Sequence, residues 1–223
     1  MNSEESERPR GRPTAAQANQ VPERLLEAAT WLFSHQGYGR TSMEKIAKRA
    51  GASSKTIYSR FPNKEAVLRA VVRRMFDLSM ASDTRVSGAG DPRRGLRRIG
   101  RDLASLSAAP ETAGVNRLIM SEAFQVPELG DLFVELHERA TELVQGHLIR
   151  WAESGLLSNL PEPRHSAMLF VEMTASLPRL HALLGRPLSA KDTEKLLTVA
   201  VDVFLGGCGY EGNASESASD PPS

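Results

Sequence analysis

The sequence has a single cysteine, no secretory leader and no long apolar run. Cys208 has no second cysteine to pair with, so an intrachain disulfide is excluded, which fits a reducing compartment. The first 20 residues contain no apolar stretch of the kind that directs secretion. The longest apolar run, residues 196–205, is interrupted by Asp202 and is much shorter than the roughly 20 residues that a membrane-spanning helix needs. We therefore expect a cytoplasmic protein with no membrane segment.

Signals for β-strands are also scarce. Aromatic residues make up only 5% of the 223 residues, and no segment alternates apolar and polar side chains for long enough to form a sheet. Apolar residues, which reach 40%, instead recur at helical spacing. The sequence predicts an all-α fold, long enough for one small domain and one larger one.

Catalytic and metal-binding motifs are missing as well. The segment Ser42-Met43-Glu44-Lys45 fits the S-x-x-K pattern of penicillin-recognising enzymes, but neither S-D-N nor K-T-G follows it. His137 and His147 would lie about 15 Å apart along one helix, too far to share a metal ion. The sequence therefore predicts no enzyme, no cofactor and no metal site.

Charge is distributed unevenly along the chain. Residues 1–75 carry 14 Lys and Arg against 7 Asp and Glu, a net charge of +7, and the remaining residues carry 14 against 20, a net charge of −6. A basic N-terminal third on an acidic body is expected where one end of a protein faces a polyanion. The alternative is chance clustering on solvated helix faces.

Four segments of different composition follow one another. Residues 1–20 contain several prolines and few apolar side chains and are expected to form a flexible basic arm. Residues 21–80 are expected to hold three short helices and a connector helix, with a helix-turn-helix at about 42–61. Residues 81–207 are expected to form a larger helical domain and residues 208–223 a disordered tail.

Start and stop signals place the individual helices. The first helix is expected to begin near Pro22 and to end at Gly37, and the connector helix to begin at Asn63. The helices of the larger domain are expected at 92–106, 110–124, 127–154, 163–184 and 190–205. Pro178 is a candidate for a kink, and C-terminal caps are expected at Gly155, Gly185 and Gly206.

A helix-turn-helix pattern follows the first helix. Thr41 and Glu44 make a T-x-x-E capping box that is expected to open the second helix. Ala47, Gly51 and Ile57 then have the spacing that this motif requires. The alanine lets the two helices approach, the glycine permits the turn, and the isoleucine fills the wedge between the helices.

The residues around this pattern resemble the TetR/AcrR family of bacterial transcriptional regulators. The matching positions are Ala28, Ala29, Leu32, Phe33, Gly37, Tyr38, Thr41, Ser42, Ile46, Ala47, Ala50, Gly51, Ser53, Thr56, Ile57, Tyr58, Phe61, Lys64 and Glu65. Further on, the segments Glu122-Ala123-Phe124, Pro127-Glu128-Leu129 and Gly155-Leu156-Leu157 resemble the regulatory domain of AefR-like members. The resemblance implies a homodimeric repressor that binds near-palindromic double-stranded operator DNA and is released by a small-molecule effector.

The resemblance also implies which residues contact DNA. Phosphates would be held by Thr41, Ser42, Tyr58 and Lys64, and the third helix would lie in the major groove. The chemistry agrees, because a helix N-terminus, a hydroxyl and an ammonium each suit a phosphate oxygen. Base reading is expected of the polar residues on the third helix, with the lysine the favoured partner of a guanine edge; these are Ser53, Ser54, Lys55, Thr56, Ser59 and Arg60.

The N-terminal arm offers a second contact. Arg10 and Arg12 lie in an R-G-R-P segment that resembles an AT-hook, and narrow A·T-rich minor grooves attract arginine. The alternative is an arm that only keeps the protein in solution.

The larger domain contains many soft and aromatic side chains, which adapt to irregular apolar ligands. We expect a small, largely apolar effector to bind there, with two histidines as polar anchors; the alternative is that these side chains form plain core. The candidates are Met120, Phe124, Phe133, His137, His147, Trp151, Met168, Phe170 and Met173.

The last two helices are expected to hold the dimer together. Each presents an apolar stripe that can pack with its symmetry mate, although the stripes can also pack inside one chain. The stripe residues are Met168, Val171, Ala175 and Leu180 on one helix and Leu196, Leu197, Val201, Phe204 and Leu205 on the other.

A ligand-free architectural DNA-binding protein is the remaining alternative. The size and acidity of residues 91–207 argue against it, since a DNA anchor needs far less chain. An arginine stripe from Arg93 to Arg101 can face DNA or an anionic ligand, or be solvated and paired with acidic neighbours.

Overall fold

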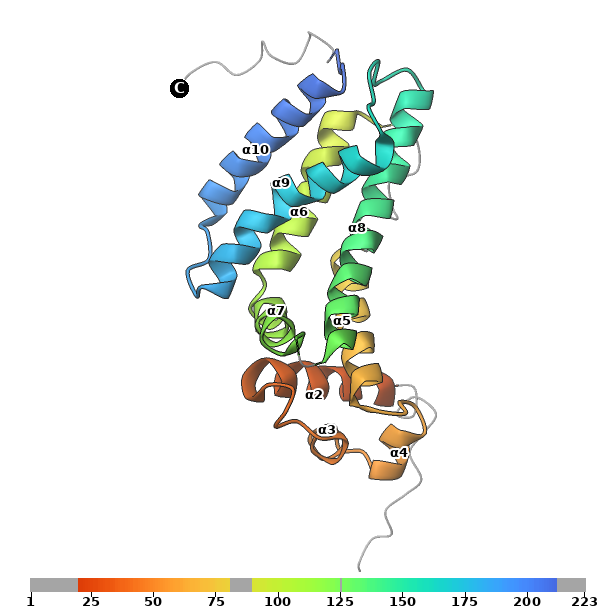
Figure 1. Cartoon of the computed structure of the whole chain (residues 1–223), viewed down its shortest axis with the longest axis vertical. Coiled ribbons are helices and arrows are strands. Elements are labelled where there is room, and N and C mark those ends of the chain that lie inside the picture. Colours follow the sequence, from red (N-terminus) through yellow and green to blue (C-terminus); the bar gives the residue numbers. More distant parts are fainter. Residues whose placement is uncertain (1–19, 81–89, 125, 212–223) are drawn as a thin grey trace, which may run out of the picture.

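The computed structural model describes residues 20–80, 90–124 and 126–211, and within these ranges every regular element is a helix. Figure 1 shows a small group of helices at one end and a larger bundle at the other. The predicted all-α fold is confirmed. The expected arm with Arg10 and Arg12, most of the loop before residue 90 and the expected tail from residue 212 lie outside the described residues.

The smaller end consists of α2 (Val21–Gln36), α3 (Met43–Arg49) and α4 (Ser54–Tyr58), and α5 (Lys64–Met80) leads from it towards the bundle (Figure 1). Gly37 ends α2 with φ of 82°, and its amide donates to the carbonyl of Phe33. Asn63 accepts the amide of Ala66 at 2.8 Å, so the expected start of the connector helix is confirmed.

The larger bundle consists of α6 (Pro92–Ala108), α7 (Pro110–Glu122), α8 (Pro127–Glu153), α9 (Pro163–Leu183) and α10 (Ala190–Gly207). All five begin at the residues that the sequence indicated, because proline or a capping side chain marks each start. Helix α9 continues through Pro178. The cap expected at Gly206 is wrong: α10 includes this residue, and the left-handed turn falls at Gly209 with φ of 63°.

Two apolar cores lie inside the molecule, and they share helices. The first core joins α2–α5 to the side of α7, through Val115 and Ile119, and to the start of α8, through Leu129. The second core fills the space between α6, the later part of α8, α9 and α10, with Phe170 fully buried in it. Because α7 and α8 contribute to the first core while also bounding the bundle, movement in the bundle has a direct packing route to α2.

Helix α7 lies directly on α2 at a glycine (Figure 1). A Cβ atom on Gly114 would stand 2.6 Å from Cβ and 3.0 Å from Cα of Ser34, closer than side-chain packing permits. Only glycine allows this approach without a shift of one helix.

Ion pairs join α5 to α8. The carboxylate of Glu135 accepts hydrogen bonds from Arg69 and Arg73, the Nε of Arg73 at 2.7 Å. Burial alone would raise the pKa of Glu135, but these hydrogen bonds and charges outweigh it, so its pKa lies below the ordinary value. The connector helix is therefore tied to the bundle by charge as well as by apolar contact.

Candidate nucleic-acid interface and internal cavity

Helices α3 and α4 form the predicted helix-turn-helix. Ile46, Ala47 and Ile57 are almost completely buried where the two helices meet, and Gly51 has φ of 65° in the turn between them. The hydroxyl of Ser53 caps α4 by accepting the amide of Thr56 at 3.1 Å. The steric roles that the sequence assigned to Ala47, Gly51 and Ile57 are confirmed.

The cap of α3 differs from the expectation. Ser42, not Thr41, is the N-cap, and its hydroxyl accepts the amide of Lys45 at 3.3 Å. The Thr41 side chain is turned inward, where its hydroxyl donates to the carbonyl of Gly37 at 2.8 Å and is 2% exposed as a residue. The phosphate contact expected of the Thr41 side chain is therefore wrong in this structure, because that hydroxyl closes the turn after α2. Ser42 remains partly accessible at the helix N-terminus.

The outer surface of the motif is strongly basic. Between residues 40 and 60 the chain carries six Lys and Arg and one acidic residue, Glu44. Several cations that the sequence reasoning missed are exposed on this surface beside α4, and the Nζ of Lys45 is anchored to the carbonyl of Arg40 at 2.7 Å. They are Arg40, which precedes α3, and Lys45 and Lys48, whose spacing of three residues on the outer face of α3 was the signal in the sequence.

The residues expected to read bases fall into two groups. Ser54, Lys55 and Arg60 are exposed, and their side chains make no polar contact with other described residues. The hydroxyls of Ser53 and Thr56 lie 2.8 Å apart, and that of Ser59 donates to the carbonyl of Thr56, so these three stabilise the helix itself. The exposed group is the better placed for contact with base edges.

Tyr58 is half exposed, and its hydroxyl donates to the carboxylate of Glu44 at 2.9 Å. The pKa of Glu44 is lowered by its own backbone amide first, then by the hydroxyls of Ser42 and Tyr58. The hydrogen bond to Glu44 in turn raises the pKa of Tyr58. A phosphate that takes the Tyr58 hydroxyl must therefore replace this carboxylate as its partner.

Lys64 is partly buried at the start of α5. Its ammonium donates to the carbonyls of Tyr38 at 2.7 Å and Thr41 at 3.0 Å and lies 4.0 Å from the centre of the Tyr38 ring. Burial lowers the pKa of Lys64. In this structure the side chain ties the loop between α2 and α3 to α5, and two of its three N–H donors are used by these carbonyls, which leaves one for the expected phosphate contact.

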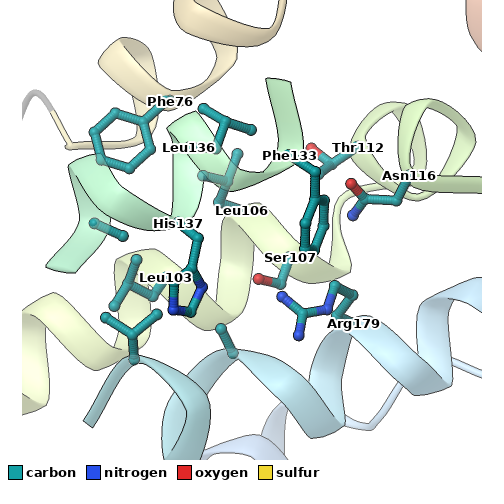
Figure 2. A pocket seen from close by; sticks show the side chains of 13 residues that line it. Phe76, Leu103, Leu106, Ser107, Thr112, Asn116, Phe133, Leu136, His137 and Arg179 are labelled. Atoms are coloured by element: carbon teal, nitrogen blue, oxygen red, sulfur yellow. The ribbon is translucent and has the colours of Figure 1, made fainter. Parts of the chain in front are cut away.

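A cavity of about 70 Å³ lies inside the bundle, between α5, α6, α7, α8 and α9 (Figure 2). Its apolar wall includes Phe76, Leu103 and Leu136, and polar side chains come from α6, α7, α8 and α9. Figure 2 shows the polar side chains around the ring of Phe133, apart from His137, which lies nearer to Leu103. These polar residues are Ser107, Thr112, Asn116, His137 and Arg179.

Only two of the nine residues expected to surround a ligand line this cavity, Phe133 and His137. The others face elsewhere because each has a different angular position on its helix. His147, Trp151 and Phe170 are buried in the second core, Met168 and Met173 are partly buried on α9, and Met120 and Phe124 are 50% and 98% exposed at the end of α7. The sequence reasoning missed the polar cavity residues on α6, α7 and α9, since no spacing distinguishes them from surface residues.

Most of the stripe residues expected at a dimer interface are buried within the single chain, so they have no surface left for a partner to cover. This part of the expectation is wrong, because these residues face the protein's own core, whereas Leu180 of the same expected stripe is exposed. The buried residues are Val171, Ala175, Leu197, Val201, Phe204 and Leu205. Leu180 is one of several large apolar side chains exposed on these two helices; the others are Leu169, Leu177 and Leu184 of α9 and Val199 and Val203 of α10.

The arginine stripe on α6 is largely paired with α10. Arg93 binds the carboxylate of Asp202, and the Nε of Arg101 donates to Glu194 at 2.6 Å. The hydrogen bond from Arg101 lowers the pKa of Glu194. The paired alternative for this stripe therefore agrees with the structure.

Within the described ranges, no three His, Cys, Asp or Glu side chains gather closely enough to hold a metal ion. In the same part of the chain, no helix combines the length and apolar character needed to cross a membrane.

Comparison with known proteins gives consistent matches along the chain. The family model of bacterial regulatory proteins of the tetR family matches residues 25–71, and that of the C-terminal domain of AefR-like transcriptional repressors matches residues 94–209. Over 189 residues the chain is 25% identical to the HTH-type transcriptional regulator YvkB of Bacillus subtilis (strain 168), which covers 82% of this chain and 95% of that protein. It is 27% identical over 185 residues to the regulator RutR of Escherichia coli (strain K12), covering 74% and 78% respectively. A crystal structure of a TetR-family regulator from Mesorhizobium loti is 26% identical, covers 87% of this chain and 98% of its own, and superposes with a TM-score of 0.71.

Proposed function

Because this chain belongs to the TetR family of helix-turn-helix transcriptional regulators, we propose that it is a homodimeric repressor released from a near-palindromic operator by a small, largely apolar ligand. The family and the relatives are regulators, not enzymes. Regulators of this family bind operator DNA, dimerise and respond to small-molecule effectors. In this chain a different part of the molecule supports each of these three roles.

DNA binding is assigned to the exposed face of α3 and α4. The exposed Lys55 supports contact with a guanine edge from α4, and the accessibility of Ser42 and Tyr58 supports phosphate binding by these two residues. The basic residues of α3 add electrostatic attraction that does not depend on sequence.

Dimerisation is assigned to the exposed apolar face of α9 and α10. Leu180 and Leu184 on α9 are 51% and 68% exposed, and Val199 and Val203 on α10 are 61% and 63% exposed. A two-fold axis through this face would place two α4 helices on one side of a duplex, at half-sites roughly 34 Å apart. Such a pair requires a near-palindromic operator.

The position of the cavity is the observation that supports release of the DNA by a ligand. Thr112 and Asn116 line it from α7, and Gly114, between them in sequence, presses on Ser34 of α2. The cavity, at about 70 Å³, is smaller than the ~300–1,000 Å³ typical of ligand pockets, so a ligand has to widen it. If the wider cavity requires α7 to shift, α2 must shift with it because the two helices are in contact. A ligand that binds the wide arrangement of the helices ~1–3 kcal/mol more tightly than the narrow one is enough for a useful switch.

The test is a ligand screen followed by DNA binding. Apolar compounds are first screened for a rise in the melting temperature of the full-length protein, and each binder is then added to its complex with the intergenic DNA upstream of its own gene. We expect binders to release the DNA from wild type and not from Ser107→Leu, which fills the cavity. Ser105→Leu, on the exposed side of the same helix, is the matched control. Binders that leave the DNA complex intact would contradict the proposed release.

A further inference from the structure

We propose that the ligand that fits the cavity carries an acidic oxygen group, such as a carboxylate, bound by Arg179. Its hydrocarbon or aromatic body would lie against Phe76, Leu103 and Leu136 at the other end of the cavity. This assignment rests on the proposed function only in taking the cavity as the effector site.

The guanidinium of Arg179 is held in place with donors to spare. Its Nη2 donates to the hydroxyl of Ser176 at 3.1 Å and to the carboxylate of Glu172 at 3.4 Å, and its carbon lies 5.3 Å from the centre of the Phe133 ring. The Arg179 side chain is only 19% exposed, and its Nε and Nη1 make no polar contact with the described residues. A carboxylate can accept from that free edge in a charge-assisted fork.

Two more polar side chains line the same cavity from α7, across the Phe133 ring from Arg179 in Figure 2, and have no partners among the described residues. The hydroxyl of Thr112 is buried and makes no hydrogen bond. Asn116, one turn further along α7, is 6% exposed, and its side-chain amide has no hydrogen bond with the described residues. Buried polar groups are normally satisfied, so the open Thr112 hydroxyl, with the unbonded Asn116 amide on the same helix, supports a ligand oxygen at this part of the cavity.

The charges around the cavity favour an anion over a cation or a neutral compound. No Asp or Glu is among the described residues that line it, and Arg179 is the lining residue with a permanent charge. Glu172, the nearest carboxylate, is shared among Arg179, Ser176 and His137, whose Nδ1 lies 3.4 Å away. A cationic ligand would meet no free counter-charge, and a neutral one could accept a hydrogen bond from the guanidinium but would supply no charge of opposite sign.

The experiment compares probes that differ only in charge. Phenylacetate, phenylacetamide and phenethylamine share one aromatic body, and octanoate with octanamide repeats the comparison for an alkyl chain. Isothermal titration of each into the full-length protein is expected to show both acids binding at least tenfold more tightly than their amides, with the amine weakest.

Variants then assign the preference to Arg179. Arg179→Gln is expected to reduce each acid to the affinity of its amide, and Arg179→Lys, which keeps the charge but loses the fork, to retain part of the preference. Arg164→Gln is the matched control, because Arg164 lies on the same helix, is paired with Glu138 and does not line the cavity. Should Arg179→Gln fail to fold, Arg179→Lys and Thr112→Val are each still expected to weaken acid binding several-fold.

The outcomes separate this assignment from the proposed function. Three results would each overturn the anion site: amides that bind as tightly as acids, acids whose affinity is unchanged in Arg179→Gln, or a panel in which no acid binds. Acids that bind through Arg179 but leave the operator complex intact would uphold the anion site and overturn release by ligand.

Discussion

At the scale of single residues, the hydroxyl of Tyr58 is shared between a protein carboxylate and, in the proposed complex, a phosphate. Tyr58→Phe removes this donor and leaves Glu44 facing the DNA without its hydrogen bond. We expect binding to weaken by about 0.5–1.5 kcal/mol for operator and scrambled duplexes alike, because the lost contact reads no base. Fluorescence anisotropy measures both affinities, with Ser59→Ala as the control. A loss confined to the operator would show that Tyr58 contributes to base reading.

Thr112 provides a second test at this scale, one that needs no ligand. Its buried hydroxyl has no hydrogen bond, so Thr112→Val should raise the stability of the unliganded protein by about 1 kcal/mol. Thr141→Val is the matched control, because the Thr141 hydroxyl is also buried but donates to the carbonyl of His137 at 2.9 Å. Denaturant unfolding compares the two. If both variants shift the free energy of unfolding in the same direction, the Thr112 hydroxyl has a partner in solution.

At the scale of elements, the contact between α7 and α2 links the cavity to the DNA-binding end. Gly114→Ala would place a methyl group against Ser34, and we expect it to push the helices apart and to weaken operator binding without any ligand. Gly130→Ala is the control, since its new Cβ would meet only Ala123 at 3.8 Å and should stabilise α8 by roughly 0.5–1 kcal/mol. Operator affinity and melting temperature are measured for both. If Gly114→Ala bound the operator with wild-type affinity, the contact between α7 and α2 would not be the one that transmits the effect of the ligand.

The sequence predicted the helix starts well because proline and capping side chains act locally. It chose Thr41 as the cap of α3 where the structure has Ser42, since both carry a hydroxyl and the outcome depends on how the turn after α2 packs. In the stripe that it selected on α9, Val171 and Ala175 face inward, whereas Leu180 is exposed. That helix packs against α6, α8 and α10 and still exposes leucines, so apolar spacing alone cannot tell the covered faces from the free one.

The candidate site was predictable only in part, because local sequence patterns do not show how helices distant in the sequence pack together. The helix-turn-helix has steric requirements that appear in the sequence at Ala47, Gly51 and Ile57. The cavity has none: Arg179 and Asn116 are polar residues on amphipathic helices, and nothing local distinguishes them from solvated ones. Their role emerges from the packing of helices distant in sequence.

At the scale of the whole molecule, the proposed repressor requires two copies of the chain. Leu180→Glu would introduce charge into the exposed apolar face of α9 and α10, and we expect a monomer with an intact fold and much weaker operator binding. Leu78→Glu, on α5, changes a leucine of similar exposure, 62%, outside this face. Sedimentation at micromolar concentration distinguishes monomer from dimer. A dimeric Leu180→Glu protein would place the interface elsewhere.

The central claim is that the face of α3 and α4 recognises a particular DNA sequence. Its most direct measurement is the affinity of the full-length protein for the intergenic DNA upstream of its own gene, compared with a scrambled duplex of equal composition, over a series of salt concentrations. We predict that at near-physiological salt the protein binds the intergenic DNA at least ~10³-fold more tightly than the scrambled duplex. Lys55→Ala is expected to reduce the difference in binding free energy between the two duplexes by about 1–3 kcal/mol. Equal affinity for the two duplexes at every salt concentration would contradict sequence-specific recognition by this face.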